Sequence, residues 1–135
     1  MLVSFIIPHK GREKLLEQTM QSVLDLDFDL QKIEIIVVTQ NKTLERANLN
    51  RNPIPLKIIF RPEYETISSL RNRGVDHASG EYLVFLDADI QLSRNWLNTM
   101  FEELQAKPER VLVSAAQRCA PNAGIIEKIR VTLNN

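Results

Sequence analysis

Short runs of strand-forming residues alternate along this chain with stretches whose apolar side chains recur at helical spacing. The apolar runs, which are typical of strands buried on both faces, span residues 2–8, 33–39, 56–60 and 82–86. The stretches with an apolar stripe on one helical face span residues 11–24, 66–78 and 93–104. Strands that alternate with amphipathic helices form sheets covered by helices on both faces. The alternation therefore predicts an α/β fold with a mostly parallel sheet.

Local signals set the limits of several elements. Ser93 is a good N-cap for the helix that follows it, and Gly80 supplies a stop for the preceding helix. Residues 41–55 contain prolines and asparagines with little periodicity, which predicts a loop with at most one helical turn. A fifth strand begins within 111–114. Residues 125–133 fit a strand or a helix, and we favour a strand.

Length and charge exclude several classes of protein. The chain has 135 residues with 17 basic and 17 acidic side chains, which fits one domain around a single core. This balance argues against a nucleic-acid binder with a basic surface, because phosphate neutralisation supplies most of that affinity. A lone cysteine, Cys119, cannot form an internal disulfide, which favours a reducing compartment. Without a membrane-spanning run or a signal peptide, we expect a cytoplasmic protein.

The motif Asp87-Ala88-Asp89 is the sharpest chemical feature of the sequence. It follows the buried run 82–86 directly, so two carboxylates emerge at the end of a strand, where ligands of such sheets bind. Hard oxygen ligands suit Mg²⁺ or Mn²⁺, which bridge the oxygens of a diphosphate. The segment 25–29 repeats the pattern twice (DLDFD), but it lies in an acidic connector and predicts a solvated turn.

Basic residues lie near the predicted ends of other elements. The segment 8–12 (PHKGR) follows the first strand, and Gly11 permits close approach of a ligand to the backbone. A lone histidine such as His9 is ordinarily a surface residue. Arg71 is adjacent in phase to the apolar stripe of its helix, where a guanidinium can reach a phosphate at the sheet edge. Taken alone, Arg71 is more simply interpreted as a solvated charge.

On these residues the chain resembles the N-terminal, nucleotide-binding part of family 2 glycosyltransferases, which have the GT-A fold. The resemblance covers roughly residues 2–116 and is most specific in the block 78–89 (ASGEYLVFLDAD). The other matching segments are Val3-Ser4-Phe5-Ile6-Ile7-Pro8, the run 33–38 and Arg71-Asn72-x-Gly74. A weaker echo is of lactose-synthase-type galactosyltransferases, in Pro8-x-x-x-Arg12-Glu13 and Val38-Thr39-Gln40.

The resemblance implies a GT-A, Rossmann-like domain that binds a nucleoside-diphosphate sugar, most often a UDP-sugar. Arg71 would approach the diphosphate, while Asp87 and Asp89 would hold Mn²⁺ or Mg²⁺. The residues that would form the rest of the nucleotide-sugar site are Pro8, His9, Lys10, Arg12, Thr39, Gln40 and Ala88, together with Asp87.

Two departures from the family pattern concern the nucleobase. The family usually ends its first strand with Pro-x-Tyr-Asn, where this chain has Pro8-His9-Lys10-Gly11. It usually carries an acidic pair after the second strand, where this chain has Thr39-Gln40-Asn41. The carboxylate that reads the uracil edge is therefore missing, and an amide would have to substitute for it.

The catalytic base of the family lies well after the metal motif, and no carboxylate of this chain matches it. We therefore expect residues 1–135 to be one donor-binding domain, a fragment that lacks the acceptor-binding half. Its full-length parent would transfer a hexose to the hydroxyl of a carbohydrate or glycolipid acceptor in polysaccharide or glycoconjugate synthesis. A truncated sheet exposes apolar surface, which predicts a homodimer or an aggregation-prone monomer.

Three alternatives come from other classes. A non-catalytic module that binds a nucleotide sugar or a partner chain fits the Thr39-Gln40 departure and the missing base. A nucleotidyltransferase needs a glycine-rich basic loop after the first strand, where this chain has only Gly11. A phosphorelay receiver needs an acidic pair at the position of His9 and Lys10.

Overall fold

The computed structural model describes residues 1–106, 112–118 and 126–133. It contains a sheet with strands in the order β3-β2-β1-β4-β6-β5. The strands are β1 (Val3–His9), β2 (Ile33–Thr39), β3 (Leu56–Phe60), β4 (Tyr82–Phe85), β5 (Leu112–Arg118) and β6 (Ile126–Leu133). The helices are α1 (Glu13–Leu24), η1 (Leu30–Lys32), α2 (Arg46–Leu49), α3 (Ile67–Asp76) and α4 (Trp96–Ala106).

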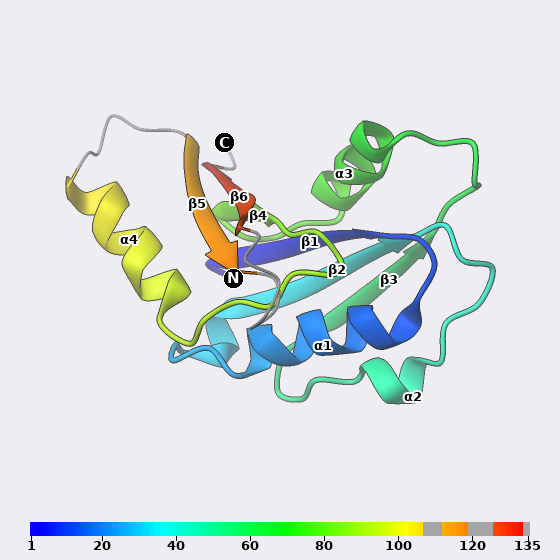
Figure 1. The fold of residues 1–135 in the computed structure, drawn as a ribbon, viewed down its shortest axis with the longest axis horizontal. Helices are drawn as coiled ribbons and strands as arrows, with labels where there is room; N and C mark the ends of the chain where they lie inside the picture. The colour runs from blue at the N-terminus through cyan, green and yellow to red at the C-terminus, as the bar shows by residue number, and fades with distance from the viewer. Residues whose placement is uncertain (107–111, 119–125, 134–135) are drawn as a thin grey trace.

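Strands β1 to β4 are parallel, whereas β6 runs antiparallel to both β4 and β5. The α/β fold with a mostly parallel sheet is therefore confirmed. Strand β1 lies between β2 and β4, so the chain moves from β1 toward β2 and β3 and then crosses back to β4 (Figure 1). Such a reversal leaves a crevice at the carboxyl ends of the two neighbouring strands.

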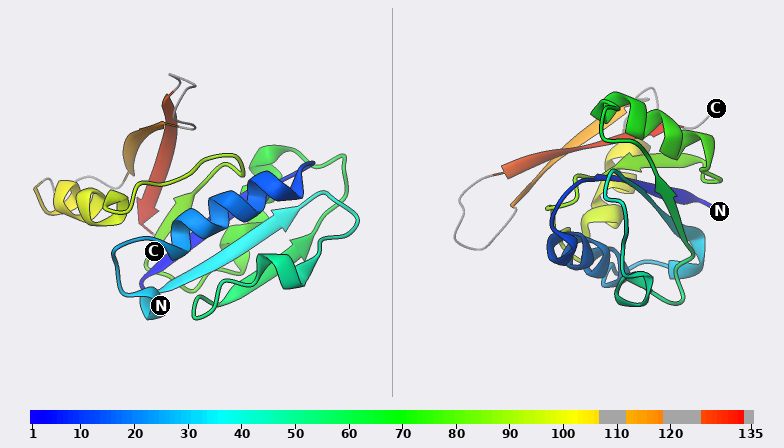
Figure 2. Two further views of the ribbon diagram at one scale, coloured as in Figure 1. Left: turned by 60° about the horizontal axis from the view of Figure 1, so that its bottom comes forward. Right: turned by 90° about the vertical axis from the view of Figure 1, so that its right-hand side faces the viewer.

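Helices cover both faces of the sheet. Successive residues of a strand point to opposite faces, so each face presents apolar side chains that a helix can bury. Phe5 and Ile7 of β1 belong to a large core cluster that also contains residues of α1 and α4. Ile6 points the other way and packs with Leu70 of α3 in a second cluster. Figures 1 and 2 show α1 and α3 on opposite sides of the parallel strands. Burial on both faces explains the nearly continuous apolar runs of β1 and β2.

Two glycines permit close packing against β1. A Cβ atom on Gly74 of α3 would overlap the side chain of Ile6. A Cβ atom on Gly80 would lie 2.6 Å from Ser4 Oγ and 2.7 Å from its backbone nitrogen. The helix stop predicted at Gly80 is wrong, because α3 ends at Asp76 and Gly80 instead lets the next segment approach the start of β1.

A buried carboxylate fixes the amino-terminal end of the sheet. Glu34 of β2 accepts hydrogen bonds from Ser4 Oγ and from the backbone nitrogen of Ser79, both at 2.6 Å. Lys57 Nζ lies 3.3 Å from the same carboxylate and also donates to the carbonyl oxygen of His77 at 2.7 Å. These bonds satisfy a group that would be costly to bury alone.

Most of the predicted elements are found with small shifts. The single turn expected within 41–55 is α2, and the segment 125–133 contains strand β6. The N-cap predicted at Ser93 is wrong: α4 begins at Trp96, and Ser93 Oγ donates to Asn95 Oδ1 instead of bonding to a backbone N–H. Cys119 and the predicted boundaries at 111 and 125 lie outside the described residues. None of the described helices has the length and apolar character that crossing a membrane requires.

Candidate functional site

A cleft of about 570 Å³ lies where the carboxyl ends of β1 and β4 meet. The loop after β1, the segment after β4 and the start of α3 form its walls. The residues that line it are Pro8, His9, Lys10, Gly11, Arg12, Leu15, Ile67, Asp87, Ala88 and Asp89. The fold therefore brings together the two segments that the sequence predicted as ligand-binding, although 75 residues of sequence separate Arg12 from Asp87.

The two carboxylates of the Asp-x-Asp motif both line this cleft. The side chain of Asp87 is 42% exposed, and its Oδ1 lies 3.7 Å from Nη2 of Arg71 on α3. Arg71 Nε is buried and has no hydrogen-bond partner among the described residues. This contact places the Arg71 guanidinium at the sheet edge beside Asp87, while its approach to a diphosphate stays a prediction.

Helix α1 holds the segment between these carboxylates. Thr19 is fully buried, and its hydroxyl donates to the carbonyl oxygen of Ala88 at 2.9 Å. One turn later, Ser22 Oγ accepts a hydrogen bond from the backbone nitrogen of Leu92 at 3.0 Å. The position of Asp87-Ala88-Asp89 therefore depends on polar side chains of α1 as well as on β4.

The acidic connector between α1 and η1 is remote from the cleft lining. Asp25, Asp27 and Asp29 are all exposed. Asp25 accepts a hydrogen bond from Gln21, and Asp29 accepts one from the backbone nitrogen of Gln31 in η1. The prediction of a solvated turn for residues 25–29 is confirmed.

The loop after β1 has a buried histidine at its base. His9 is 3% exposed, with Nδ1 2.9 Å from Thr39 Oγ1 and Nε2 3.2 Å from the carbonyl oxygen of Arg12. A carbonyl can only accept, so in the neutral ring Nε2 carries the proton and the hydroxyl of Thr39 donates to Nδ1. The expectation of a surface histidine is wrong, because His9 ties β1 to β2 and closes its own loop. Lys10 and Arg12 are exposed at the cleft.

Thr39 and Gln40 are buried at the end of β2 and are not among the residues that line the cleft. The Nε2 atom of Gln40 donates to the carbonyl oxygens of Pro62, Glu63 and Glu65, at 3.1, 3.2 and 2.8 Å. The amide of Gln40 is therefore engaged by the loop after β3. The expectation that Thr39 and Gln40 contact the nucleotide stays a prediction.

Asn41, the last residue of the departure after β2, contacts the loop after β1. Its Oδ1 accepts from the backbone nitrogen of Gly11 and its Nδ2 donates to the carbonyl oxygen of Gly11, both at 2.8 Å. Gly11 has a φ of 97°, in the region that favours glycine. The place of Asn41 directly after a parallel strand indicated this edge of the sheet but not its partner, Gly11.

The loop after β3 also carries an ion pair. Arg61 and Glu65 are joined through Arg61 Nη2 and Nε and the Oε1 atom of Glu65, and Ser69 Oγ donates to the other oxygen at 3.2 Å. The hydrogen bond between the two side chains raises the pKa of Arg61 and lowers the pKa of Glu65, although desolvation opposes both shifts. The four-residue spacing of the opposite charges of Arg61 and Glu65 is the sequence signal for this ion pair.

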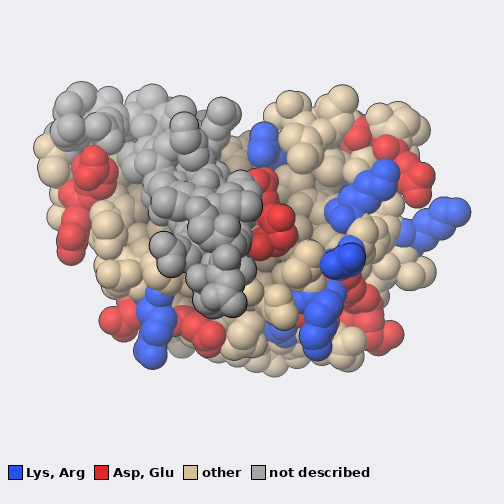
Figure 3. Space-filling model, viewed as in Figure 1, with Lys and Arg blue, Asp and Glu red and all other residues tan. Residues whose placement is uncertain are grey.

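Charges are unevenly distributed on the face drawn in Figure 3. An acidic patch lies near its centre, and Lys and Arg side chains gather over the right-hand ends of β1 and β2. Exposed cations beside carboxylates suit a ligand that is a polyanion and also carries a divalent cation.

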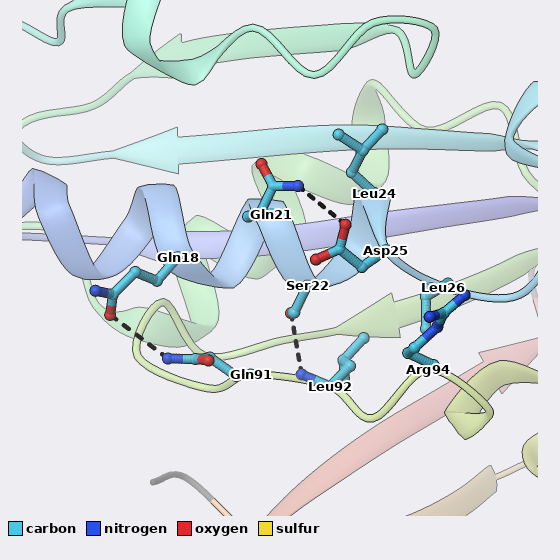
Figure 4. A pocket seen from close by; sticks show the side chains of 9 residues that line it. All are labelled: Gln18, Gln21, Ser22, Leu24, Asp25, Leu26, Gln91, Leu92 and Arg94. Carbon is cyan, nitrogen blue, oxygen red and sulfur yellow. Dashed lines mark hydrogen bonds between the residues drawn. The ribbon is translucent and has the colours of Figure 1, made fainter.

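Another hollow, of about 700 Å³, lies elsewhere, between α1 and the segment before α4 (Figure 4). It is lined by Gln18, Gln21, Ser22, Leu24, Asp25, Leu26, Gln91, Leu92 and Arg94. Its polar groups are largely bonded to one another, as in the pairs Gln21–Asp25 and Ser22–Leu92. We place the functional site in the smaller cleft, because charged groups converge there at the carboxyl ends of the strands.

The cleft offers two carboxylates to a cation. Among the described residues no group of three or more His, Cys, Asp or Glu side chains is arranged to hold a metal ion. Mg²⁺ and ions like it are commonly bound through one or two carboxylates, with substrate phosphates and water as further ligands. Asp87 and Asp89 therefore fit a metal that arrives with a phosphorylated ligand, rather than one held by the protein alone.

The sequence model of the family described as "Glycosyl transferase family 2" matches residues 4–131. A GalNAc(5)-diNAcBac-PP-undecaprenol beta-1,3-glucosyltransferase from Campylobacter jejuni is 31% identical over 106 residues, covering 75% of this chain and 34% of that protein. A dolichol-phosphate mannosyltransferase from Pyrococcus furiosus is 35% identical over 96 residues, covering 67% of this chain and 26% of that protein. The chain spans about a third of the length of such curated relatives.

Solved structures share the fold. TarS residues 1–349 of S. aureus in complex with UDP-GlcNAc aligns with a TM-score of 0.79 at 21% identity, covering 94% of this chain and 37% of that one. The mannosyltransferase PcManGT from Pyrobaculum calidifontis, in complex with GDP-Man and Mn²⁺, aligns with a TM-score of 0.76 at 26% identity, covering 86% and 35%. The GT-A-like fold is thereby confirmed, while the echo of lactose-synthase-type galactosyltransferases stays a prediction.

Proposed function

The chain belongs to glycosyl transferase family 2, and on that basis we propose that its cleft binds the nucleoside-diphosphate sugar from which the parent enzyme transfers a hexose. The observation that carries this proposal is the convergence of Lys10, Arg12, Asp87 and Asp89 in one cleft. Cations and carboxylates that line one space match a diphosphate with its divalent metal.

Each group has a distinct part in this proposal. Asp87 and Asp89 hold Mn²⁺ or Mg²⁺, and Arg71 adds positive charge near the diphosphate from behind Asp87. When bound, the metal stabilises the negative charge that develops on the departing diphosphate. Lys10 and Arg12 are exposed in the loop after β1, where they attract the polyanion and orient it. Pro8, His9 and Ala88 shape the floor of the cleft.

We propose a UDP-sugar as the donor, with GDP-sugars as the competitor to test. The S. aureus structure is a complex with UDP-GlcNAc and the Pyrobaculum structure a complex with GDP-Man and Mn²⁺, so both nucleotides occur among structural relatives. The parent protein passes the sugar to a hydroxyl of a carbohydrate or glycolipid acceptor in the cytoplasm. Residues 1–135 supply the donor site for that transfer.

Titration calorimetry with UDP, in the presence and absence of Mn²⁺, tests the proposal. We expect binding that requires the metal and that is lost in Asp89→Ala. The matched control is Asp27→Ala, which removes an exposed aspartate from the other Asp-x-Asp pattern and should leave binding unchanged. The absence of metal-dependent binding of UDP and GDP, or equal binding by Asp89→Ala, would overturn the proposal.

A non-catalytic nucleotide-sugar module is the second candidate, favoured by the amides that replace the usual acidic pair after β2. The Gln40 amide is engaged by backbone carbonyls, which leaves the nucleobase without a carboxylate from that position. Binding of UDP is expected for both candidate functions. Slow metal-dependent release of free sugar from a UDP-sugar, lost in Asp89→Ala, would favour the enzyme, whereas binding without turnover would favour the module.

A further inference from the structure

The loop after β1 is held to the end of β2 by a two-point contact. The side-chain amide of Asn41 both accepts from Gly11 N–H and donates to Gly11 C=O, each at 2.8 Å. The backbone N–H of Asn41 donates to Thr39 Oγ1 at 3.0 Å. The same oxygen is hydrogen-bonded to Nδ1 of His9. Gly11 lines the cleft, so this contact sets the position of one of its walls.

The loop after β3 is held to the same place through main-chain atoms. Gln40 offers two N–H groups to three carbonyl oxygens of residues 62–65, so at least one N–H is shared between them. Gln40 is only 8% exposed, which shields these bonds from water. The loop leads directly into α3, whose first residue, Ile67, lines the cleft.

From these contacts we propose that Gln40 and Asn41 are positioning residues. Asn41 locks the loop after β1, which forms a wall of the donor cleft, and Gln40 locks the loop after β3, which leads into the helix whose first residue lines that cleft. The inference rests on the proposed function, since it assigns these amides to the shape of that cleft. The cleft is thereby preorganised, so that a nucleotide does not have to order its walls on binding.

The chemistry of an amide is required for this arrangement. A carboxylate is an acceptor only, so it can replace neither the donation of Asn41 to Gly11 C=O nor that of Gln40 to three carbonyls. The carboxylates of an acidic pair at these positions would lie against carbonyl oxygens, and no hydrogen bond could form because neither group carries a proton. The departure at Thr39-Gln40-Asn41 is therefore a device for joining loops, and the nucleobase is read by other groups.

Paired variants of Asn41 test the proposal in the whole chain. Asn41→Ala should remove the protection of the Gly11 amide against hydrogen exchange and weaken the binding of UDP with Mn²⁺ roughly tenfold. Asn41→Asp keeps the acceptor for Gly11 N–H, so it should retain exchange protection at Gly11 and lose less affinity. If Asn41 only contributed to overall stability, the two variants would not differ in exchange at the Gly11 amide alone.

Gln40→Glu places a carboxylate against the carbonyls and should raise hydrogen exchange across residues 61–66, with a similar loss of affinity. The matched controls are Asn48→Ala and Gln31→Ala, whose exposed side chains make no hydrogen bond within the described part of the chain. Unchanged Gly11 exchange in Asn41→Ala would overturn the inference, as would full affinity in both Asn41→Ala and Gln40→Glu. If the unaltered chain fails to bind UDP or GDP, the proposed function fails, and the exchange data still decide whether these amides hold the loops.

Discussion

At the scale of single residues, Ala88 shows how the site depends on a side chain outside it. Ala88 lies between the two carboxylates that line the cleft, and its carbonyl oxygen accepts the hydroxyl proton of Thr19 at 2.9 Å. Thr19 lies on the buried face of α1, where a hydroxyl is costly to bury unless it is hydrogen-bonded. Here it couples α1 to the segment that carries Asp87 and Asp89.

Thr19→Val should separate this coupling from packing, because the two side chains have the same shape. The variant leaves a part-buried carbonyl without its donor, so we expect a loss of about 1 kcal/mol in unfolding free energy and weaker binding of UDP with Mn²⁺. Denaturant unfolding and calorimetry measure the two effects. Thr99→Val, at an exposed position of α4, is the control. Normal affinity in a destabilised Thr19→Val protein would show that the tether does not position the carboxylates.

At the scale of elements, the approach of α3 to β1 determines where Arg71 and Ile67 lie. Gly74 allows this approach, because any Cβ atom there would overlap Ile6 Cγ2. Gly74→Ala should therefore cost about 1–3 kcal/mol of unfolding free energy, despite the better helix propensity of alanine. In a double-mutant cycle, Ile6→Ala should recover part of the loss caused by Gly74→Ala. If the losses of unfolding free energy in Gly74→Ala and Ile6→Ala simply add, contact with Ile6 is not the cause of the destabilisation.

The loop between β3 and α3 should be sensitive to acid. The hydrogen bond from Arg61 lowers the pKa of Glu65, so the folded state binds a proton there less readily than the unfolded state does. The stabilisation is fully present above the ordinary glutamate pKa of about 4.3 and is lost as the pH falls through the lowered pKa.

Glu65→Gln removes this proton linkage. We expect the variant to be less stable than the unaltered chain at pH 7 and the difference to shrink as the pH falls below about 4.3. Denaturation midpoints collected between neutral and acid pH measure this. Glu63→Gln changes an exposed neighbour in the same loop and serves as control. A difference that stays constant with pH would show that the charge of Glu65 does not stabilise the loop.

Local pattern was enough to predict most elements and the general place of the site. The runs of β1, β2 and β4 are apolar because both of their faces are covered, and Asp87 and Asp89 follow a strand directly. The roles of Gln40 and Asn41 could not be predicted in this way. Their partners lie 22 to 30 residues away in sequence, and nothing in the local spacing indicates them. His9 was misjudged for the same reason, because Thr39 buries it from a neighbouring strand.

At the scale of the whole molecule, the sheet ends on one side at β3. Phe60 at the end of this strand is 51% exposed, and Tyr64 and Ile67 in the following segment are 85% and 55% exposed. An edge strand next to exposed apolar side chains favours self-association. The homodimer expected from the sequence therefore stays a prediction, with β3 as the place to test it.

Phe60→Lys should shift the chain toward monomer, because a charge on an edge strand opposes strand-to-strand pairing. Light scattering over a range of protein concentrations measures the effect. Lys42→Ala, at an exposed position in another loop, is the comparison variant and should leave the mass unchanged. A monomer at every concentration in the unaltered chain would contradict the prediction.

The way in which Gln40 holds residues 62–65 has a consequence for the evolution and redesign of this protein. Gln40 donates hydrogen bonds to backbone carbonyl oxygens, which every amino acid supplies. The shape of the loop therefore does not depend on the side chains at 63 and 64. Those two positions are exposed and can mutate without loss of the loop. A library randomised at Glu63 and Tyr64 should therefore keep a high fraction of folded members.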